Sequence, residues 1–490
     1  MASKPPAVSE RSATGVPSWW RDAKLGIFIH WTIASIPAFA PPVGVYGDLL
    51  ASGAPDAFKV SPYVEWYENS LRFDDSPAAA FHRATYPNRS YRSFAHDFEA
   101  GLASWDPAAW AARFAATGAR YVVLVAKHHD GWCLWPTKVT NPRLPRWHSA
   151  RDIVGELAEA VRAQGLKFGV YYSGGLDWTF CDSPMGSMGG VIAAIPRGDY
   201  PAYARAQVLE LIERYSPDVL WNDIAWPEPR AALFSLFERY YEAVPDGVVN
   251  DRWMPWSPLA LLARTRAGRR LIDARIASTA AKDGGLVPPK PPHFDVRTPE
   301  YTVFDDVEST PWECVRGMDH SFGYNAQSTP EDFISHDELL LTLTDIASKG
   351  GNLLLNVGPR GIDAAIPELQ DERLGWLAGH RPAFEESLVG TRPWVVPAEE
   401  LEGGGEVRYT AKDDTVFLHV FDPASTITLT MLELTPEGRA QRLDGTPVPT
   451  TSSTTGTTLD LSGLVSPGRP LDGPLVIAVT GTRGRQRTLG

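Results

Sequence analysis

The 490-residue chain contains only three cysteines, at positions 133, 181 and 314. No two of them form a CxxC pair, so their spacing excludes a disulfide framework and a cysteine-based structural zinc site. The sequence also lacks the HxH and HExxH spacings that are typical of zinc-binding histidines. We therefore expect the protein to hold no metal.

Positive charge and long apolar runs are scarce as well. The formal net charge is −13 at pH 7, whereas binding to nucleic acid or to an anionic membrane needs clustered Lys and Arg. No stretch approaches the ~18–20 apolar residues of a membrane span, and the first residues have no apolar signal-peptide core. We expect a cytoplasmic protein that binds neither nucleic acid nor membrane. The sequence leaves open whether it is a homo-oligomer.

Up to about residue 385, short apolar runs alternate with segments of helical periodicity. This alternation is typical of parallel β/α units and predicts the α/β fold class. We expect strands at residues 25–31, 121–126, 166–172, 219–223, 247–252 and 353–358, and helices at 106–118, 152–163 and 201–216. The predicted architecture is a (β/α)8-like TIM barrel over residues 18–385.

The pattern changes after residue 385. Short β-rich runs are separated by Gly, Pro and Asp, which predicts an antiparallel β-sandwich domain over residues 386–482. The runs are residues 415–421, 425–432 and 475–480, while residues 450–458 look like turn material. We expect residues 1–17 to be a disordered leader and residues 483–490 a flexible tail.

Polar residues follow several of the predicted strands. The strand over residues 219–223 ends in Asp223 before a Trp-Pro pair, and the first strand ends at His30. Because TIM-barrel active sites lie at the C-terminal ends of the strands, Asp223 is a candidate catalytic carboxylate. The alternative is an Asp that caps the next helix in a βα loop.

The second strand runs into His128-His129-Asp130. The two imidazoles could bind zinc, cap the barrel top structurally, or bind substrate hydroxyls. Adjacent residues on a strand point to opposite faces, so both imidazoles can reach one ion only if the strand has already ended. Carboxylates, imidazoles and Trp rings at one barrel mouth suit a polyhydroxylated substrate, and glycoside hydrolysis needs two carboxyl groups.

Four ordered motifs resemble the α-L-fucosidases of glycoside hydrolase family 29. The segment 127–135 (KHHDGWCLW) is similar to the family's KHHDGF-type motif, and 26–31 (GIFIHW) resembles its first strand. The segments 220–223 (LWND) and 348–359 (SKGGNLLLNVGP) resemble its nucleophile strand and its last strand. The matches extend over roughly residues 19–385. The resemblance implies a small-molecule carbohydrate partner and no metal or other cofactor.

The resemblance further implies a retaining exo-α-L-fucosidase that forms a covalent fucosyl-enzyme intermediate. Asp223 matches the nucleophile. The acid/base has two candidates: the T-x-E-Y context favours Glu300, and Glu313 in the Trp-Glu pair is the alternative. The sugar-binding positions implied by the family are His30, Glu65, Trp66, His128, His129, Tyr171, Trp221, Arg252 and Phe322. Two of these positions have alternatives. The ring that points into the barrel could be Tyr172 instead of Tyr171, and Phe322 could be a plain core residue.

Two other functions stay open, a non-catalytic fucose-binding barrel and a glycosidase for a related sugar such as an α-L-galactoside. The presence of both carboxylates favours the hydrolase. Residues 253–299 depart from the family, whose connection here is short. We expect this Arg- and Pro-rich insertion to be a surface loop outside the barrel, and it is a candidate wall of the leaving-group subsite. It contains the loop-like cluster Arg264, Arg266, Arg269 and Arg270.

Overall fold

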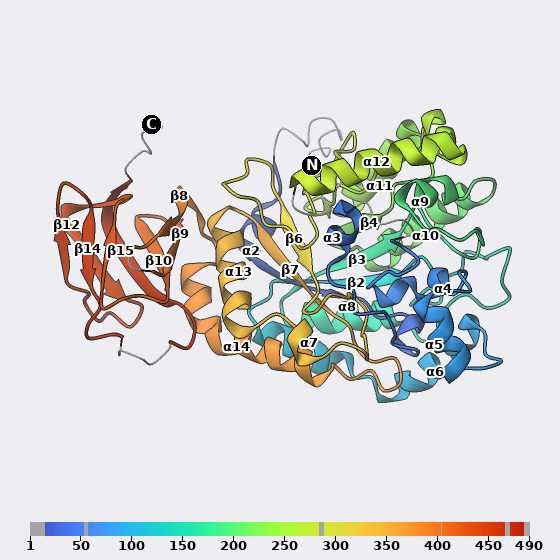
Figure 1. The fold of residues 1–490 in the computed structure, drawn as a ribbon, viewed down its shortest axis with the longest axis horizontal. Helices are drawn as coiled ribbons and strands as arrows, with labels where there is room; N and C mark the ends of the chain where they lie inside the picture. The colour runs from blue at the N-terminus through green and yellow to red at the C-terminus, as the bar shows by residue number, and fades with distance from the viewer. Residues whose placement is uncertain (1–14, 53–56, 284–288, 403, 466–470, 485–490) are drawn as a thin grey trace, which may run out of the picture.

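The computed structural model describes residues 15–52, 57–283, 289–402, 404–465 and 471–484, with a barrel domain beside a smaller β domain (Figure 1). Seven parallel strands form a curled sheet in the order β5-β4-β3-β2-β1-β7-β6. They are β1 (Leu25–Ile29), β2 (Tyr121–Lys127), β3 (Lys167–Ser173), β4 (Val219–Asp223), β5 (Val248–Val249), β6 (Glu313–Arg316) and β7 (Asn352–Val357).

Residues 296–300 lie between the two edge strands, β5 and β6. Parallel bridges join Val296 to Asn250 and Glu300 to Val315, and the Val315 amide donates to the Pro299 carbonyl over 2.9 Å. The segment therefore takes the eighth position of the barrel, which confirms the predicted fold class. Our prediction that residues 253–299 lie outside the barrel is wrong at their C-terminal end. The pairing is irregular and includes a proline, so it leaves no alternating pattern in the sequence.

The three predicted helices are present as α7 (Pro107–Ala116), α8 (Ile153–Ala163) and α10 (Tyr200–Tyr215). The α7 helix begins where expected because the Asp106 carboxylate accepts hydrogen bonds from two first-turn amides and Pro107 occupies the first position. The other helices that cover the barrel are α2 (Ser18–Ala23), α3 (Tyr46–Ala51), α4 (Tyr67–Ser70), α5 (Pro77–Thr85), α6 (Phe94–Gly101), α9 (Met188–Ala194), α11 (Arg230–Ala243), α13 (His336–Ser348) and α14 (Glu368–Ser387).

The insertion is largely helical, which corrects the predicted surface loop. Residues Pro258–Arg264 form a 3-10 helix and Arg266–Asp283 form the long helix α12, so the arginine cluster is helical too. The α12 helix lies across α3 and α9 at the mouth of the barrel (Figure 1). Most of its side chains are exposed or half-buried, so the segment carries no apolar stripe from which a helix could be recognised.

Side chains alternate between two apolar layers along each barrel strand, as the period of two requires. In β2, Val123 points into the barrel, whereas Val122 packs between the sheet and the helices. In β3, Tyr171 points into the barrel and Tyr172 points outward. The strands thus deliver Tyr171, and not Tyr172, to the interior.

The C-terminal residues form two antiparallel sheets around their own apolar core. The strands are β8 (Arg392–Glu400), β9 (Glu406–Lys412), β10 (Thr415–Phe421), β11 (Thr426–Leu429), β12 (Leu432–Arg442), β13 (Thr450–Ser452), β14 (Thr457–Asp460) and β15 (Leu475–Gly484). Residues 450–458, predicted as turn material, contain β13 and the start of β14, because Thr has a high β propensity. Arg483 pairs with Glu433, so the flexible tail predicted from residue 483 does not begin there. Residues 485–490 lie outside the described residues.

The predicted disordered leader does not extend to residue 17. Val16 is buried in an apolar cluster with Trp20, Val248 and Val296, and residues 1–14 lie outside the described part of the chain. Among the described helices, none combines the length and the apolar character needed to cross a bilayer.

Candidate active site

A pocket opens at the C-terminal ends of the barrel strands, and most of the predicted site residues line it. The predicted residues on its wall are His30, Glu65, Trp66, His128, Tyr171, Trp221, Asp223, Arg252, Glu300 and Phe322. His129 lies behind this wall, with its Nε2 atom 3.8 Å from the Asp223 carboxylate. Segments that are more than 250 residues apart in the chain thus meet at one site, as parallel strands around a barrel require.

Asp223 ends β4 and is held by three donors. The Tyr171 hydroxyl donates to Oδ2 over 2.9 Å, and the Ile224 amide donates to Oδ1 over 2.9 Å. Arg252 Nη1 lies 3.2 Å from Oδ1. The next helix, α11, begins at Arg230 with Pro229 as its N-cap. Asp223 is therefore not the helix cap that the sequence offered as an alternative, and it faces the pocket.

The two candidates for the acid/base lie in different surroundings. Glu300 is on the pocket wall, where Oε1 lies 2.6 Å from Arg252 Nη1 and Oε2 accepts a hydrogen bond from the Tyr63 hydroxyl over 3.1 Å. Glu313 is fully buried in β6 below the pocket, and it accepts hydrogen bonds from Tyr121 Oη and Trp221 Nε1. Burial raises the pKa of Glu313 to about 7. Of the two, only Glu300 lines the pocket.

The tautomers of two histidines follow from their partners. Ser173 donates its hydroxyl hydrogen to the Leu176 carbonyl, so His129 Nδ1, 2.6 Å away, must donate to the Ser173 oxygen. The Asn356 amide nitrogen donates to a carbonyl, which leaves Oδ1 to accept from His30 Nδ1 over 2.6 Å. In each ring Nε2 is then an acceptor. His129 Nε2 is a buried acceptor without a hydrogen-bond partner among the described residues.

Burial keeps three histidines and Glu65 uncharged at neutral pH. It lowers the pKa of His30 to about 3 and that of His129 to about 4, and it lowers the pKa of His128 well below its usual value. Burial also raises the pKa of Glu65 to about 8. Neutral donors and acceptors suit the hydroxyl groups of an uncharged sugar.

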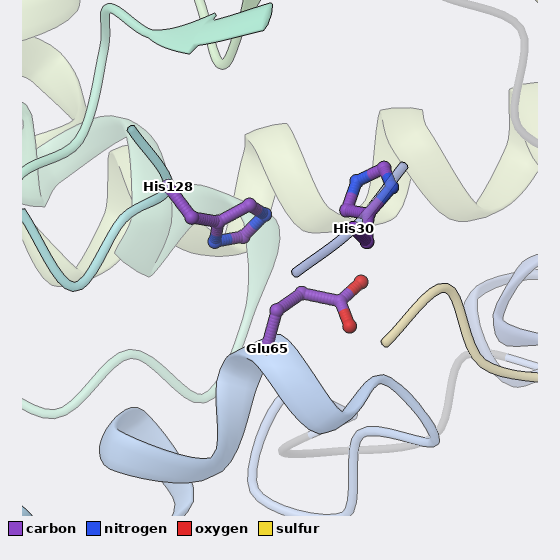
Figure 2. A group of neighbouring side chains, drawn as sticks. All are labelled: His30, Glu65 and His128. Carbon is purple, nitrogen blue, oxygen red and sulfur yellow. The ribbon is translucent and has the colours of Figure 1, made fainter. Parts of the chain in front are cut away.

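His30, Glu65 and His128 point toward one another in Figure 2, and each offers a ligand atom within 4.8 Å of the others. Two imidazoles and one carboxylate form a known ligand set for a divalent cation. A cation would need Glu65 ionised, whereas burial favours its protonated form. The pocket chemistry therefore fits hydroxyl groups better than a metal ion, and treatment with a chelator distinguishes the two cases.

The sequence reasoning missed several residues that shape the site. Tyr63 contacts Glu300, and Ser173 and Asn356 orient the two histidines. Asn356 belongs to a motif that was recognised, but nothing in the sequence assigns its amide to His30. Phe322, for which a core position was the alternative, lines the pocket and stacks on His30 with ring centres 4.9 Å apart.

A family model for alpha-L-fucosidases matches residues 2–380 of the chain. The chain belongs to the alpha-L-fucosidase family. This confirms the resemblance seen in the sequence, and the protein is a glycoside hydrolase. Among curated proteins, the alpha-L-fucosidase of Branchiostoma floridae is 29% identical over 83% of this chain and 79% of its own length. Mouse tissue alpha-L-fucosidase is 28% identical over 82% of this chain and 77% of its own.

Solved structures of the alpha-L-fucosidase family are similar over nearly the whole chain. The alpha-fucosidase of Thermotoga maritima is 37% identical with a TM-score of 0.78, covering 96% of this chain and 98% of that one. An alpha-L-fucosynthase of the same organism, solved in complex with a fucosyl disaccharide azide, is 36% identical with a TM-score of 0.81. It covers 97% of this chain and 99% of its own.

The neighbouring tyrosines of β3 offer a matched test of the hydrogen bond to Asp223. Tyr171→Phe removes the hydroxyl that donates to the Asp223 carboxylate, and we expect it to lower kcat for an aryl α-L-fucoside about 10- to 100-fold. Tyr172→Phe removes a buried hydroxyl that donates to Gln207 on the outer face. It should leave kcat within about twofold while lowering stability by about 1–3 kcal/mol. Equal loss of kcat in both variants would contradict the assignment.

Proposed function

We propose that this protein hydrolyses terminal α-L-fucosides with retention of anomeric configuration. Asp223 attacks the anomeric carbon of fucose and expels the aglycone, whose oxygen takes a proton from Glu300. In the second step Glu300, now a carboxylate, removes a proton from water. The water attacks the anomeric carbon of the covalent fucosyl-enzyme intermediate and releases Asp223.

The observation that carries this proposal is the position of Arg252 between the two carboxylates. Its Nη1 atom lies 3.2 Å from Asp223 Oδ1 and 2.6 Å from Glu300 Oε1. Two oxygens that contact one nitrogen are at most about 6 Å apart. Retaining glycosidases have carboxyl groups about 5–5.5 Å apart, and inverting enzymes about 6.5–9.5 Å. The spacing favours direct attack by Asp223 over attack by an intervening water.

The rest of the pocket supports fucose as the sugar. Uncharged imidazoles and Glu65 offer hydrogen bonds to its hydroxyls, and Phe322 offers an apolar face to its C5-methyl group. A Thermotoga maritima alpha-fucosidase that is 36% identical was solved in complex with fucose. Since an apolar wall rejects an added hydroxyl only weakly, we expect α-L-galactosides to be slower substrates rather than excluded ones.

The first test is hydrolysis of para-nitrophenyl α-L-fucoside by wild type and Asp223→Ala, each with and without EDTA. We expect wild-type turnover to be the same in both conditions and to fall at least about 10³-fold in the variant. Proton NMR should show α-L-fucose as the first product. The β anomer should appear only later, by mutarotation.

The outcomes of this test separate the alternatives. First-formed β-L-fucose would contradict the retaining mechanism, and loss of turnover in EDTA would assign a metal to His30, Glu65 and His128. If the wild type shows no turnover but its melting temperature rises when fucose is added, the protein is a fucose-binding protein and not a hydrolase.

The second test distinguishes the acid/base candidates. Glu300→Ala removes the proton donor to the leaving oxygen, so we expect kcat/KM for a fucosyl disaccharide to fall about 10²- to 10³-fold. Aryl fucosides need little protonation and should lose about tenfold or less. Glu313→Ala, the matched control, should change both substrates by the same factor. The assignment would be reversed if Glu313→Ala slowed the disaccharide much more than the aryl fucoside while Glu300→Ala slowed both substrates by the same factor.

The third test uses the titration of Glu65. Because burial raises its pKa to about 8, Glu65 carries a proton below that pH and becomes an anion above it. We expect the affinity for L-fucose to weaken as the pH rises through about 8, and Glu65→Gln to lack this loss. Glu68→Gln is the control, since Glu68 is a partly buried carboxyl whose pKa desolvation raises to about 7, but it lies outside the pocket and pairs with Arg92. An unchanged pH dependence in Glu65→Gln would contradict the prediction.

A further inference from the structure

A second cavity, of about 590 Å³, lies beside the catalytic pocket, and three arginines line it. Arg197 follows α9, Arg264 ends the 3-10 helix of the insertion, and Arg269 is in α12. None of the three contacts a carboxylate within 4.0 Å among the described residues. Three guanidinium groups without a carboxylate partner thus lie around one cavity, in a chain whose net charge is −13.

Arg197 is held in place by contacts that leave its charge uncompensated. Arg197 lies 3.9 Å above the Trp256 ring and donates to the Pro227 carbonyl over 2.7 Å. Burial and the nearby charge of Arg264 lower the pKa of Arg197. Since like charges repel, an oxyanion that contacts both groups would remove an unfavourable interaction.

Close packing fixes the position of α12 against α9. A side chain at Gly189 would come within 2.8 Å of the Arg269 carbonyl oxygen, so only glycine permits this approach. The Gly189 amide donates to Asp273 Oδ1 over 2.7 Å. The Asp273 carboxylate, one turn after Arg269, thus accepts a hydrogen bond from α9. This bond helps to fix the position of the helix that carries Arg269.

No described residue lines both the cavity and the catalytic pocket, but α9 lies at both. Met188 of α9 lines the catalytic pocket, while Ser187 and Gly190 line the second cavity. The loop after Asp223 also serves both, because Ile224 lines the catalytic pocket and Pro227 holds Arg197. Helix α9 and this loop thus place the arginine-lined cavity next to the catalytic pocket.

We propose that Arg197, Arg264 and Arg269 form a subsite for an oxyanion group, a carboxylate or a sulfate ester, on the aglycone of the substrate. The inference rests on the proposed fucosidase activity and adds a substrate class to it, namely acidic fucosylated oligosaccharides. Arginine suits this role because its planar fork donates two hydrogen bonds to one oxyanion. The insertion between Arg252 and Glu300 supplies two of the three cations.

The test compares neutral and acidic ligands that have the same fucosyl linkage. We would measure 2′-fucosyllactose, 3-fucosyllactose and the aldonic acid of each as competitive inhibitors of para-nitrophenyl α-L-fucoside hydrolysis. Oxidation of the reducing end adds one carboxylate to each saccharide, at a different distance from the fucose in the two. Inhibition can be measured whether or not the ligand is cleaved. We expect at least one aldonic acid to bind about three- to tenfold more tightly than its parent, with a smaller advantage at high salt.

Two double variants separate the subsite from general charge. Arg264→Gln/Arg269→Gln should abolish the preference for the acid while leaving the aryl fucoside kcat/KM within about twofold. The control Arg266→Gln/Arg270→Gln removes the same charge from neighbouring side chains of α12 that do not line the cavity, and it should keep the preference. Circular dichroism and the melting temperature check that α12 stays folded in both.

Three results would overturn the inference. They are equal inhibition by acid and parent in wild type, a preference that persists in Arg264→Gln/Arg269→Gln, and a preference lost equally in the control. A further outcome is competition by inorganic sulfate without any preference between the saccharides, which would identify a site for free anions and overturn the substrate role. Failure of the fucosidase activity is distinguishable, because the wild type would then not hydrolyse the aryl fucoside at all.

Discussion

The site depends on one buried guanidinium placed between two carboxylates. Arg252 contacts both Asp223 and Glu300, and although burial opposes its charge, these carboxylates raise its pKa above the usual value. Thr298 accepts two hydrogen bonds from the same side chain, and the Arg252 guanidinium lies 4.8 Å from the centre of the Trp221 ring. Buried charges are costly unless each has its partners. This network therefore ties the loop after β5 and the irregular eighth barrel segment to β4.

The backbone is strained immediately after each proposed catalytic carboxylate. Ile224 and Ala225 follow Asp223 with φ of 57° and 71°, and Tyr301 follows Glu300 with φ of 50°. Such left-handed residues cost about 1–3 kcal/mol each and persist only where surrounding contacts hold them. The Asn222 amide supplies such contacts, since it donates to the carbonyls of Ala225 and Arg252. The sharp turns keep both carboxylates at the pocket wall and lead the chain away from it.

Much of the fold and the site could be predicted because the signals were local. Apolar runs that end in polar residues located the strands, and Asp106-Pro107 marked the start of a helix. Other features carried no local signal. The eighth barrel position is held by isolated bridges rather than by a regular ladder, and α12 has no apolar stripe. Strand β13, in a Thr-rich stretch interrupted by Gly456, has the composition of a turn although it pairs with β14.

The sequence by itself determined the chemistry that is available, namely two carboxylates, several imidazoles and aromatic rings at the ends of parallel strands. It did so because strand periodicity and motif order are properties of neighbouring residues. Only the tertiary structure decided which groups meet. It placed Glu300 on the pocket wall and Glu313 below Trp221, turned Tyr171 inward, and assigned Ser173 and Asn356 to the histidines. It also brought Arg197 together with two arginines of the insertion. These relations depend on contacts across tens to hundreds of residues, which no local pattern records.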